Sequence, residues 1–281
     1  MIIKETTERN DQNNWVKNRL LKDNFKIIEF EGYTIKDNRV TGLFDRRLFT
    51  QINFDILSEN DVLNIIQSEE LYLSAKVHFT NLLGVYYRYV FYSYVPELVY
   101  VYRFEKNLLK YKSKFTNFCD FINQTHKIRD LTMSSPLEET NMPQIDHILR
   151  NRCSYAWMGN LDGLFLSTSE NAPKALVEFQ TTNKISVKNH CNNTWFTPRN
   201  GRKGDEQRWK VFDILSKQSN LPLIIIVWSP NEVDGDIKYK VVKDIIYSDD
   251  SQGREPGLIY SVKDVIDYNE LLQRLNQLIN D

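Results

Sequence analysis

The hydrophobic positions of the first 130 residues repeat with two different periods. Helical spacing predicts helices over residues 6–24, 58–83 and 107–126, and Ser58 with Asp61 is typical of a capping box at the start of the second. Alternating spacing predicts short strands within residues 25–40 and 83–104, the latter divided by Pro96. This region therefore has the pattern of mixed α/β structure.

The polar stretch 132–143 contains two prolines and predicts a boundary. We therefore divide the chain into an N-terminal α/β region, residues 1–131, and a core, residues 132–281. In the core we expect a helix over 144–152, strands over 160–168 and 174–181, a helix over 205–219 capped by Asp205, a buried strand over 221–228, a strand over 237–247, and mostly helix over 262–279. This order predicts an α/β fold with a mixed central sheet flanked by helices.

Composition and charge narrow the classes of function. Hydrophobic residues make up 41% of the 281 residues and charged residues 26%, which is typical of a globular protein. No apolar run is long enough to span a bilayer, so we expect no membrane association. The net charge of −1 means that any signal for a nucleic-acid partner has to be local.

The three cysteines are Cys119, Cys153 and Cys191, which are far apart in the sequence and form no CxxC motif. We therefore expect neither a disulfide framework nor structural zinc, and a reducing, cytoplasmic location.

The most informative stretch is residues 159–184, which we interpret as a β-hairpin that turns near residue 170. That turn places Asp162 roughly opposite Glu178, with Gln180 two residues further along on the same face. The neighbouring positions are apolar, so two carboxylates there would repel each other and lose hydration. A hard divalent cation held by Asp162 and Glu178 is one solution, with Gln180 orienting a water or a phosphate oxygen. A solvated sheet edge is the structural alternative.

These residues resemble the PD-(D/E)XK nuclease superfamily, which has the restriction-endonuclease-like fold. The resemblance covers about residues 144–230: Asp162, fifteen intervening residues, then Glu178-Phe179-Gln180, followed by a helix and a buried strand. It implies that Asp162, Glu178 and Gln180 are catalytic and that the two acids bind Mg²⁺, with Mn²⁺ as a substitute. Leu161 stands where the family often has proline, and Gln180 stands in place of its lysine. Lys184 or Lys174 are candidates for the missing positive charge.

Basic residues are concentrated after the acid pair. Residues 171–220 contain nine basic and four acidic residues, a net charge of +5. Binding of a phosphate backbone requires a basic segment of this kind. A solvated polar loop is the alternative interpretation. We expect four of these side chains to contact nucleic acid: Lys188, Arg199, Arg202 and Lys203.

Several further residues are supporting candidates. On the helix over 205–219, Gln207 or Arg208 is expected to face the site, as the resemblance implies. The helix over 144–152 contributes Asp146, an additional acid of the kind related nucleases carry, and His147. Asn160 lies two residues before Asp162 and so shares its face.

The sequence thus predicts a Mg²⁺-dependent phosphodiesterase, most readily a DNA endonuclease of restriction or defence type, with DNA favoured over RNA. Residues 1–131 would then supply target recognition or a surface for a two-fold homodimer, by analogy with enzymes that act on palindromic sites. The alternative is a non-catalytic nucleic-acid-binding or assembly module that keeps the nuclease fold, as the replacement of the lysine by Gln180 suggests.

Overall fold

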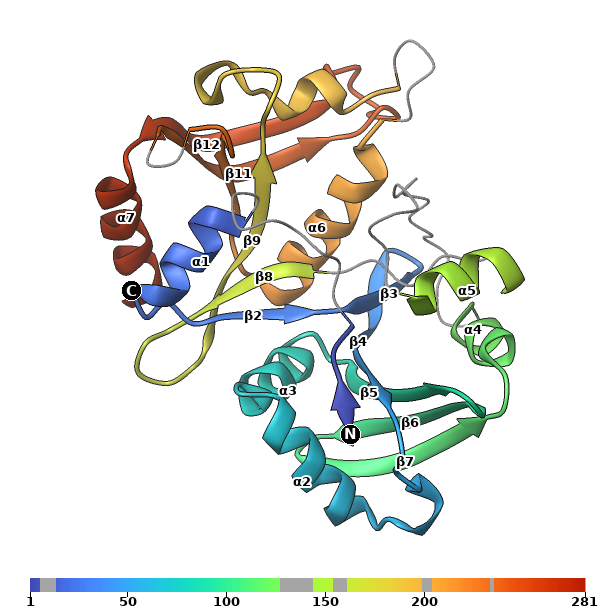
Figure 1. Cartoon of the computed structure of the whole chain (residues 1–281). Helices are drawn as coiled ribbons and strands as arrows, with labels where there is room; N and C mark the ends of the chain where they lie inside the picture. The colour runs from blue at the N-terminus through green and yellow to red at the C-terminus, as the bar shows by residue number, and fades with distance from the viewer. Residues whose placement is uncertain (6–13, 127–143, 154–160, 199–203, 233–234, 281) are drawn as a thin grey trace. The chain divides into compact units, whose positions relative to one another are not determined.

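The chain folds into a mixed α/β protein, as the sequence predicts. The computed structural model describes residues 1–5, 14–126, 144–153, 161–198, 204–232 and 235–280, which form two mixed sheets of six strands each and seven α-helices (Figure 1). Two compact units result: unit 1, Met1–Glu8 with Phe30–Leu161, and unit 2, Arg9–Glu29 with Asp162–Asp281. The predicted boundary at residues 131 and 132 lies outside the described residues.

Unit 1 is built on a sheet with the strand order β1-β4-β5-β6-β7, and β3 also pairs with β4. Its strands are β1 (Ile2–Ile3), β3 (Gly32–Lys36), β4 (Arg39–Phe49), β5 (Tyr86–Tyr94), β6 (Glu97–Glu105) and β7 (Leu108–Phe115). Its helices are α2 (Glu59–Glu69), α3 (Leu73–Leu82), α4 (Phe118–His126) and α5 (Gln144–Cys153), with a short 3-10 helix, η2 (Phe54–Ile56). The capping box of Ser58 and Asp61 is confirmed at the start of α2.

Two predictions for unit 1 are wrong in part. The helix expected over 58–83 is two helices that are interrupted after Glu69. The helix expected over 107–126 begins only at Phe118, because residues 108–115 form β7. In β7 three lysines alternate with Leu109, Tyr111 and Ser113, and this period of two belongs to a strand.

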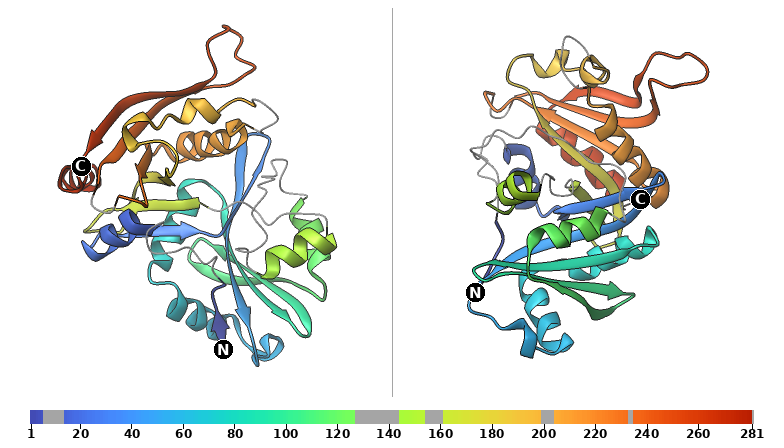
Figure 2. Two further views of the ribbon diagram at one scale, coloured as in Figure 1. Left: turned by 45° about the horizontal axis from the view of Figure 1, so that its top comes forward. Right: turned by 90° about the vertical axis from the view of Figure 1, so that its right-hand side faces the viewer.

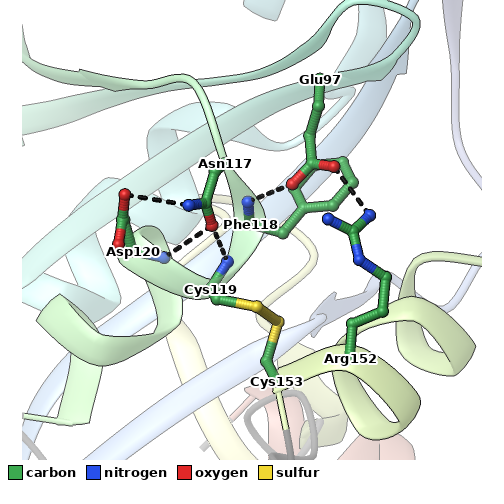
Figure 3. The surroundings of a disulfide bond; sticks show 7 residues. All are labelled: Glu97, Asn117, Phe118, Cys119, Asp120, Arg152 and Cys153. Atoms are coloured by element: carbon green, nitrogen blue, oxygen red, sulfur yellow. Dashed lines mark hydrogen bonds and ion pairs between the residues drawn. A yellow bond between two sulfur atoms is a disulfide. The ribbon is translucent and has the colours of Figure 1, made fainter.

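The helices α4 and α5 cover one face of the unit 1 sheet. Ile122 of α4 and Leu149 of α5 are fully buried against Val90 and Val99 of the sheet. A disulfide between Cys119 and Cys153 joins the two helices, with 5.1 Å between the Cα atoms (Figure 3). The expectation that the cysteines form no disulfide is therefore wrong, since it used spacing along the chain, and helix packing brings these two together.

Hydrogen bonds and an ion pair hold the start of α4 and the end of α5 beside the disulfide. The side chain of Asn117 accepts from the backbone N–H groups of Cys119 at 2.7 Å and Asp120 at 3.1 Å, which caps α4. Glu97 of β6 accepts from the Phe118 N–H at 2.5 Å and pairs with Arg152 of α5 at 2.8 Å (Figure 3). Both helices are therefore fixed to the sheet as well as to each other.

Unit 2 is built on a sheet with the strand order β12-β11-β10-β9-β8-β2. Its strands are β2 (Ile27–Phe30), β8 (Leu161–Leu166), β9 (Pro173–Thr181), β10 (Leu223–Trp228), β11 (Ile237–Ile246) and β12 (Gly257–Ile266). Its helices are α1 (Trp15–Lys22), α6 (Glu206–Ser219) and α7 (Tyr268–Asn280), with two 3-10 helices, η4 (Val187–Asn189) and η5 (Asn192–Trp195). The helix predicted over 262–279 is wrong at its start, where β12 continues to Ile266.

The sheet of unit 2 has helices on both faces. Val16 and Leu20 of α1 and Leu271 and Leu275 of α7 pack in one core with the inward residues of the strands, among them Val177. The helix α6 lies on the opposite face (Figure 1), and the turn between β11 and β12 projects from the sheet (Figure 2). Asp205 occupies the N-cap position of α6 as predicted, but its side chain makes no capping hydrogen bond. In the described part of the chain, none of the helices is long and apolar enough to cross a membrane.

Candidate functional site

The predicted register of the β8–β9 hairpin is confirmed. Gly163 pairs with Val177 and Leu164 with Leu176 in antiparallel fashion. Continuing this ladder by one residue places Asp162 opposite Glu178, so both side chains leave the sheet on the same face. Val177 packs in the core with α1 and α7, which puts the two acids on the other face, the one that α6 covers.

Glu178 is a fully buried carboxylate, with 0% of its surface exposed. It forms an ion pair with Arg208, whose side chain comes from the first turn of α6 and is 35% exposed. The ion pair is made to Oε1, and the described residues give the Glu178 carboxylate no hydrogen bond beyond it. Because Arg208 occupies Oε1, the carboxylate keeps coordination capacity on Oε2, which fits a ligand to a single cation.

Arg208 reaches Glu178 because the hydrophobic side of α6 faces the sheet. Trp209, Phe212 and Leu215 are buried beneath the helix, so the adjacent position 208 lies at the edge of that interface. Gln207, one residue earlier, is exposed. Of the two helix candidates in the sequence, the structure thus brings Arg208 to Glu178 and leaves Gln207 in solvent.

Gln180 is held in place by a hydrogen-bond network. Asn192 of η5 donates through Nδ2 to Oε1 of Gln180 at 2.8 Å. The Oδ1 atom of Asn192 accepts from Nζ of Lys240 and from the hydroxyl of Tyr260, the latter at 3.2 Å. Gln180 is therefore a positioned side chain, connected through Asn192 to β11 and β12.

Two lysines of β11, which the sequence analysis did not single out, lie on the same face as Glu178 and Gln180. Ile225 of β10 pairs with Glu178 on one side and with Lys240 on the other. Val227 pairs in the same way with Gln180 and Lys238. The Cα atom of each lysine therefore lies two strands, or roughly 10 Å, from the Cα atom of its counterpart on β9. The alternation of Ile237, Tyr239 and Val241 with the lysines could have shown that both lysines share one face.

Burial changes the protonation of this cluster. Burial, then the charges of Lys240 and Lys238, lower the pKa of His190 to about 4, so the imidazole is neutral near pH 7. A neutral ring can accept at Nδ1, which lies 3.1 Å from Nζ of Lys240. Burial and the nearby Lys238 likewise lower the pKa of Lys240 to about 7.

The other predicted residues belong to unit 1, to β9 and the loop after it, or to segments outside the described residues. Asp146 belongs to unit 1, where it is buried and binds the guanidinium of Arg46 at 2.5 and 3.0 Å, and His147 follows it on α5. Lys184 and Lys188 are exposed on the loop after β9, and Lys174 is half-buried near the start of that strand. Four predicted residues lie outside the described residues: Asn160, Arg199, Arg202 and Lys203.

The donor set for a metal is small. Among the residues that the structure describes, no group of three or more His, Cys, Asp or Glu is placed to hold a metal ion. The two acids and the oxygens of water remain, a set that suits Mg²⁺ because this ion usually keeps several waters and takes one or two carboxylates. The Oε2 atom of Glu178, which the ion pair with Arg208 leaves open, and the facing position of Asp162 fit that ion.

The chain matches no protein-family model, no curated protein and no solved structure.

Proposed function

We propose that this protein is a Mg²⁺-dependent nuclease that hydrolyses phosphodiester bonds in DNA, with a restriction-endonuclease-like core in unit 2. The observation that carries the proposal is the buried Glu178 carboxylate beside Arg208, on the face where the β8–β9 ladder also directs Asp162. The order β8, β9, α6, β10 and the parallel pairing of β9 with β10 support the likeness to the PD-(D/E)XK superfamily.

Each residue has a role in this proposal. Asp162 and Glu178 would hold the cation, which when bound supplies an acidified water and stabilises charge on the phosphate. Arg208 gives Glu178 a counter-charge and presents a guanidinium toward a phosphate. Gln180, oriented by Asn192, would donate to or accept from a water or a phosphate oxygen. Lys240 replaces the lysine of the family motif as the basic group, since Lys184 is exposed on the following loop.

The DNA preference, the endonucleolytic mode, the homodimer and the cytoplasmic location stay predictions from the sequence. The disulfide in unit 1 is a reason to test location directly, because disulfides are rare in reducing compartments.

Cleavage of supercoiled plasmid DNA by the full chain tests the proposal. We expect cleavage with Mg²⁺ or Mn²⁺, none with EDTA, and a loss of about 10³-fold or more in Asp162→Ala and Glu178→Ala. Asp264→Ala is the matched control, since Asp264 is an exposed acid of β12 whose partner is Arg274. Cleavage by the two site variants at the rate of the control would contradict the proposal.

A second candidate is a nucleic-acid-binding module without catalysis. The ion pair of Glu178 with Arg208 favours it, because a guanidinium already neutralises the carboxylate that the metal would need. Binding of DNA in EDTA, with no cleavage in Mg²⁺ or Mn²⁺ by any variant, would identify this function instead.

A further inference from the structure

Two lysines are buried in unit 2 without an acidic partner. Lys240 is 0% and Lys238 5% exposed. Nζ of Lys238 donates to the backbone carbonyls of Lys188 at 2.6 Å and His190 at 2.8 Å, and Nζ of Lys240 contacts Nδ1 of His190 and Oδ1 of Asn192. All four partners are neutral. In the part of the chain that the structure describes, no Asp or Glu lies within ion-pair distance of either lysine.

The surroundings add a third lysine and one thiol. Burial lowers the pKa of Lys238 and Lys240, and Cys191, when ionised, acts on both in the opposite direction. Lys263 of β12 pairs with Lys240 across the β11–β12 ladder. Nζ of each of these two lysines lies 5.6 Å from the ring centre of Tyr260. Lys263 is exposed, so the cluster extends from a fully buried ammonium group out to solvent. Three amines therefore gather at one place on the sheet face, and the imidazole beside them is neutral.

Such a cluster is costly unless an anion neutralises it. Burial of a charge without a counter-ion is strongly unfavourable, and buried cations in proteins are paired. Each ammonium group has three N–H donors, and the contacts above use two on Lys238 and two on Lys240. One donor on each buried lysine is left over, and Lys263 adds exposed ones; because Lys240 has no exposed surface, a ligand would reach its donor by displacing part of the covering loop with η4 and η5. Three cations around one ligand match a tetrahedral dianion better than a carboxylate.

We propose that Lys238, Lys240 and Lys263 form a binding site for a phosphoryl group, held over β11 and β12 by the loop that carries η4 and η5. The site lies on the sheet face that carries Glu178 and Gln180, but it needs neither a metal nor cleavage and does not rest on the proposed nuclease function. The phosphoryl group can belong to a nucleic-acid chain or be free inorganic phosphate, and both present the same oxygens.

Thermal unfolding of the full chain in EDTA tests the site with sodium phosphate as the probe, against sodium chloride at matched ionic strength. We expect phosphate to raise the Tm by about 3 °C or more at saturation and chloride not to do so. Lys240→Met should unfold at a higher Tm than the wild type without phosphate, because it removes an unneutralised buried charge, and should lose the phosphate response. Lys263→Met changes an exposed side chain, so the variant should fold normally. The phosphate concentration that gives half of the Tm shift should rise at least about tenfold.

Lys243→Met is the matched control, because Lys243 is an exposed lysine of the same strand, and it should keep the full response. An equal shift with chloride, or a full phosphate shift in Lys263→Met, would overturn the site. Two oligonucleotides, one without a terminal phosphate and one with a 5′-phosphate, test the source of the ligand by competition. If the oligonucleotide without a terminal phosphate abolishes the Tm response to phosphate, the site accepts backbone phosphates. If only the 5′-phosphorylated oligonucleotide abolishes it, the site accepts a terminal phosphate. If neither competes, the ligand is free phosphate.

Glu178→Ala separates this site from the proposed nuclease. The variant should lose cleavage and keep the phosphate response. If the wild type responds to phosphate but does not cut DNA, the phosphoryl site is supported and the nuclease proposal is contradicted. If it cuts DNA without a phosphate response, the nuclease proposal is supported and the phosphoryl site is contradicted.

Discussion

Glu178 of β9 and Arg208 of α6 form an ion pair in which the carboxylate is completely buried and about a third of the arginine side chain remains exposed. The pair links the first turn of the helix to the centre of the sheet. It also places one positive charge at Oε1 of a carboxylate that has no further hydrogen bond within the described residues. Stability and metal binding should therefore be coupled at this position.

Removal of Arg208 should destabilise the protein in a way that metal corrects. Arg208→Met leaves Glu178 buried without a counter-charge, and because Arg208 is partly screened by solvent we expect a loss of about 1–3 kcal/mol in the free energy of unfolding. Urea unfolding with EDTA and with Mg²⁺ measures it, and Mg²⁺ should restore more stability to the variant than to the wild type. Arg254→Met, which removes an exposed partner of Asp250, is the control and should lower the free energy of unfolding less than Arg208→Met does. Equal Mg²⁺ effects in all three proteins would contradict a cation at Glu178.

Asn192 connects the amide of Gln180 to Lys240, so it should serve both proposed sites. Asn192→Asp places a carboxylate against Nζ of Lys240 and gives that lysine an internal partner. We expect the variant to lose the rise in Tm with phosphate, because the carboxylate competes with the ligand for the same ammonium group. Asn189→Asp, which adds the same charge at an exposed position of η4, is the control. An Asn192→Asp protein with a full phosphate response would show that Lys240 does not contact phosphate.

Titration of Lys240 should make the free energy of unfolding depend on pH. Its pKa falls from 10.5 in the unfolded chain to about 7 in the fold, through burial and the charge of Lys238, while Lys263, Tyr260, His190 and Cys191 also face it. Between these values the unfolded chain binds the extra proton, so stability should rise with pH above about 7 and this gain should be absent below it. Urea unfolding from neutral to alkaline pH should show a slope in the wild type that Lys240→Met lacks. Phosphate binding should weaken over the same range, since the neutral amine attracts no anion.

The disulfide should stabilise unit 1 without contributing to the chemistry of unit 2. It closes a loop with a sequence separation of 34 residues, for which chain entropy predicts about 3–4 kcal/mol. The free energy of unfolding in urea should fall by that amount in the double variant Cys119→Ser, Cys153→Ser. A reducing agent should give the wild type the same urea unfolding curve as the double variant. Cys191→Ser is the control, because Cys191 is a free thiol and its variant should respond to the reducing agent like the wild type. A double variant as stable as the wild type would mean that the bridge does not form in solution.

Patterns within short stretches of sequence predicted those features that depend on neighbouring residues, such as the register of a hairpin. The register of the β8–β9 hairpin followed from the position of its turn, and the shared face of Asp162 and Glu178 followed from that register. The strand β7 was missed because residues 107–126 were assigned one helical period, although the lysines before Phe115 alternate.

Long-range contacts were beyond the sequence pattern. The bond between Cys119 and Cys153 depends on the packing of α4 against α5, and the meeting of Lys240 with Asn192 depends on where the loop after β9 folds back over β11. Neither relation has a period or a spacing that a single sequence displays. Arg208 was one of two neighbouring candidates, and only the hydrophobic face of α6 decided between it and Gln207.

The binding of Mn²⁺ to the full chain, measured by calorimetry, tests the central claim most directly. Asp162→Asn and Glu178→Gln each remove one negative charge and change the side-chain shape little. We predict that the wild type binds Mn²⁺ and that each variant weakens the affinity by at least about tenfold, with Asp264→Asn unchanged. Equal Mn²⁺ affinity in the wild type and in Glu178→Gln, or no binding to the wild type, would contradict the account.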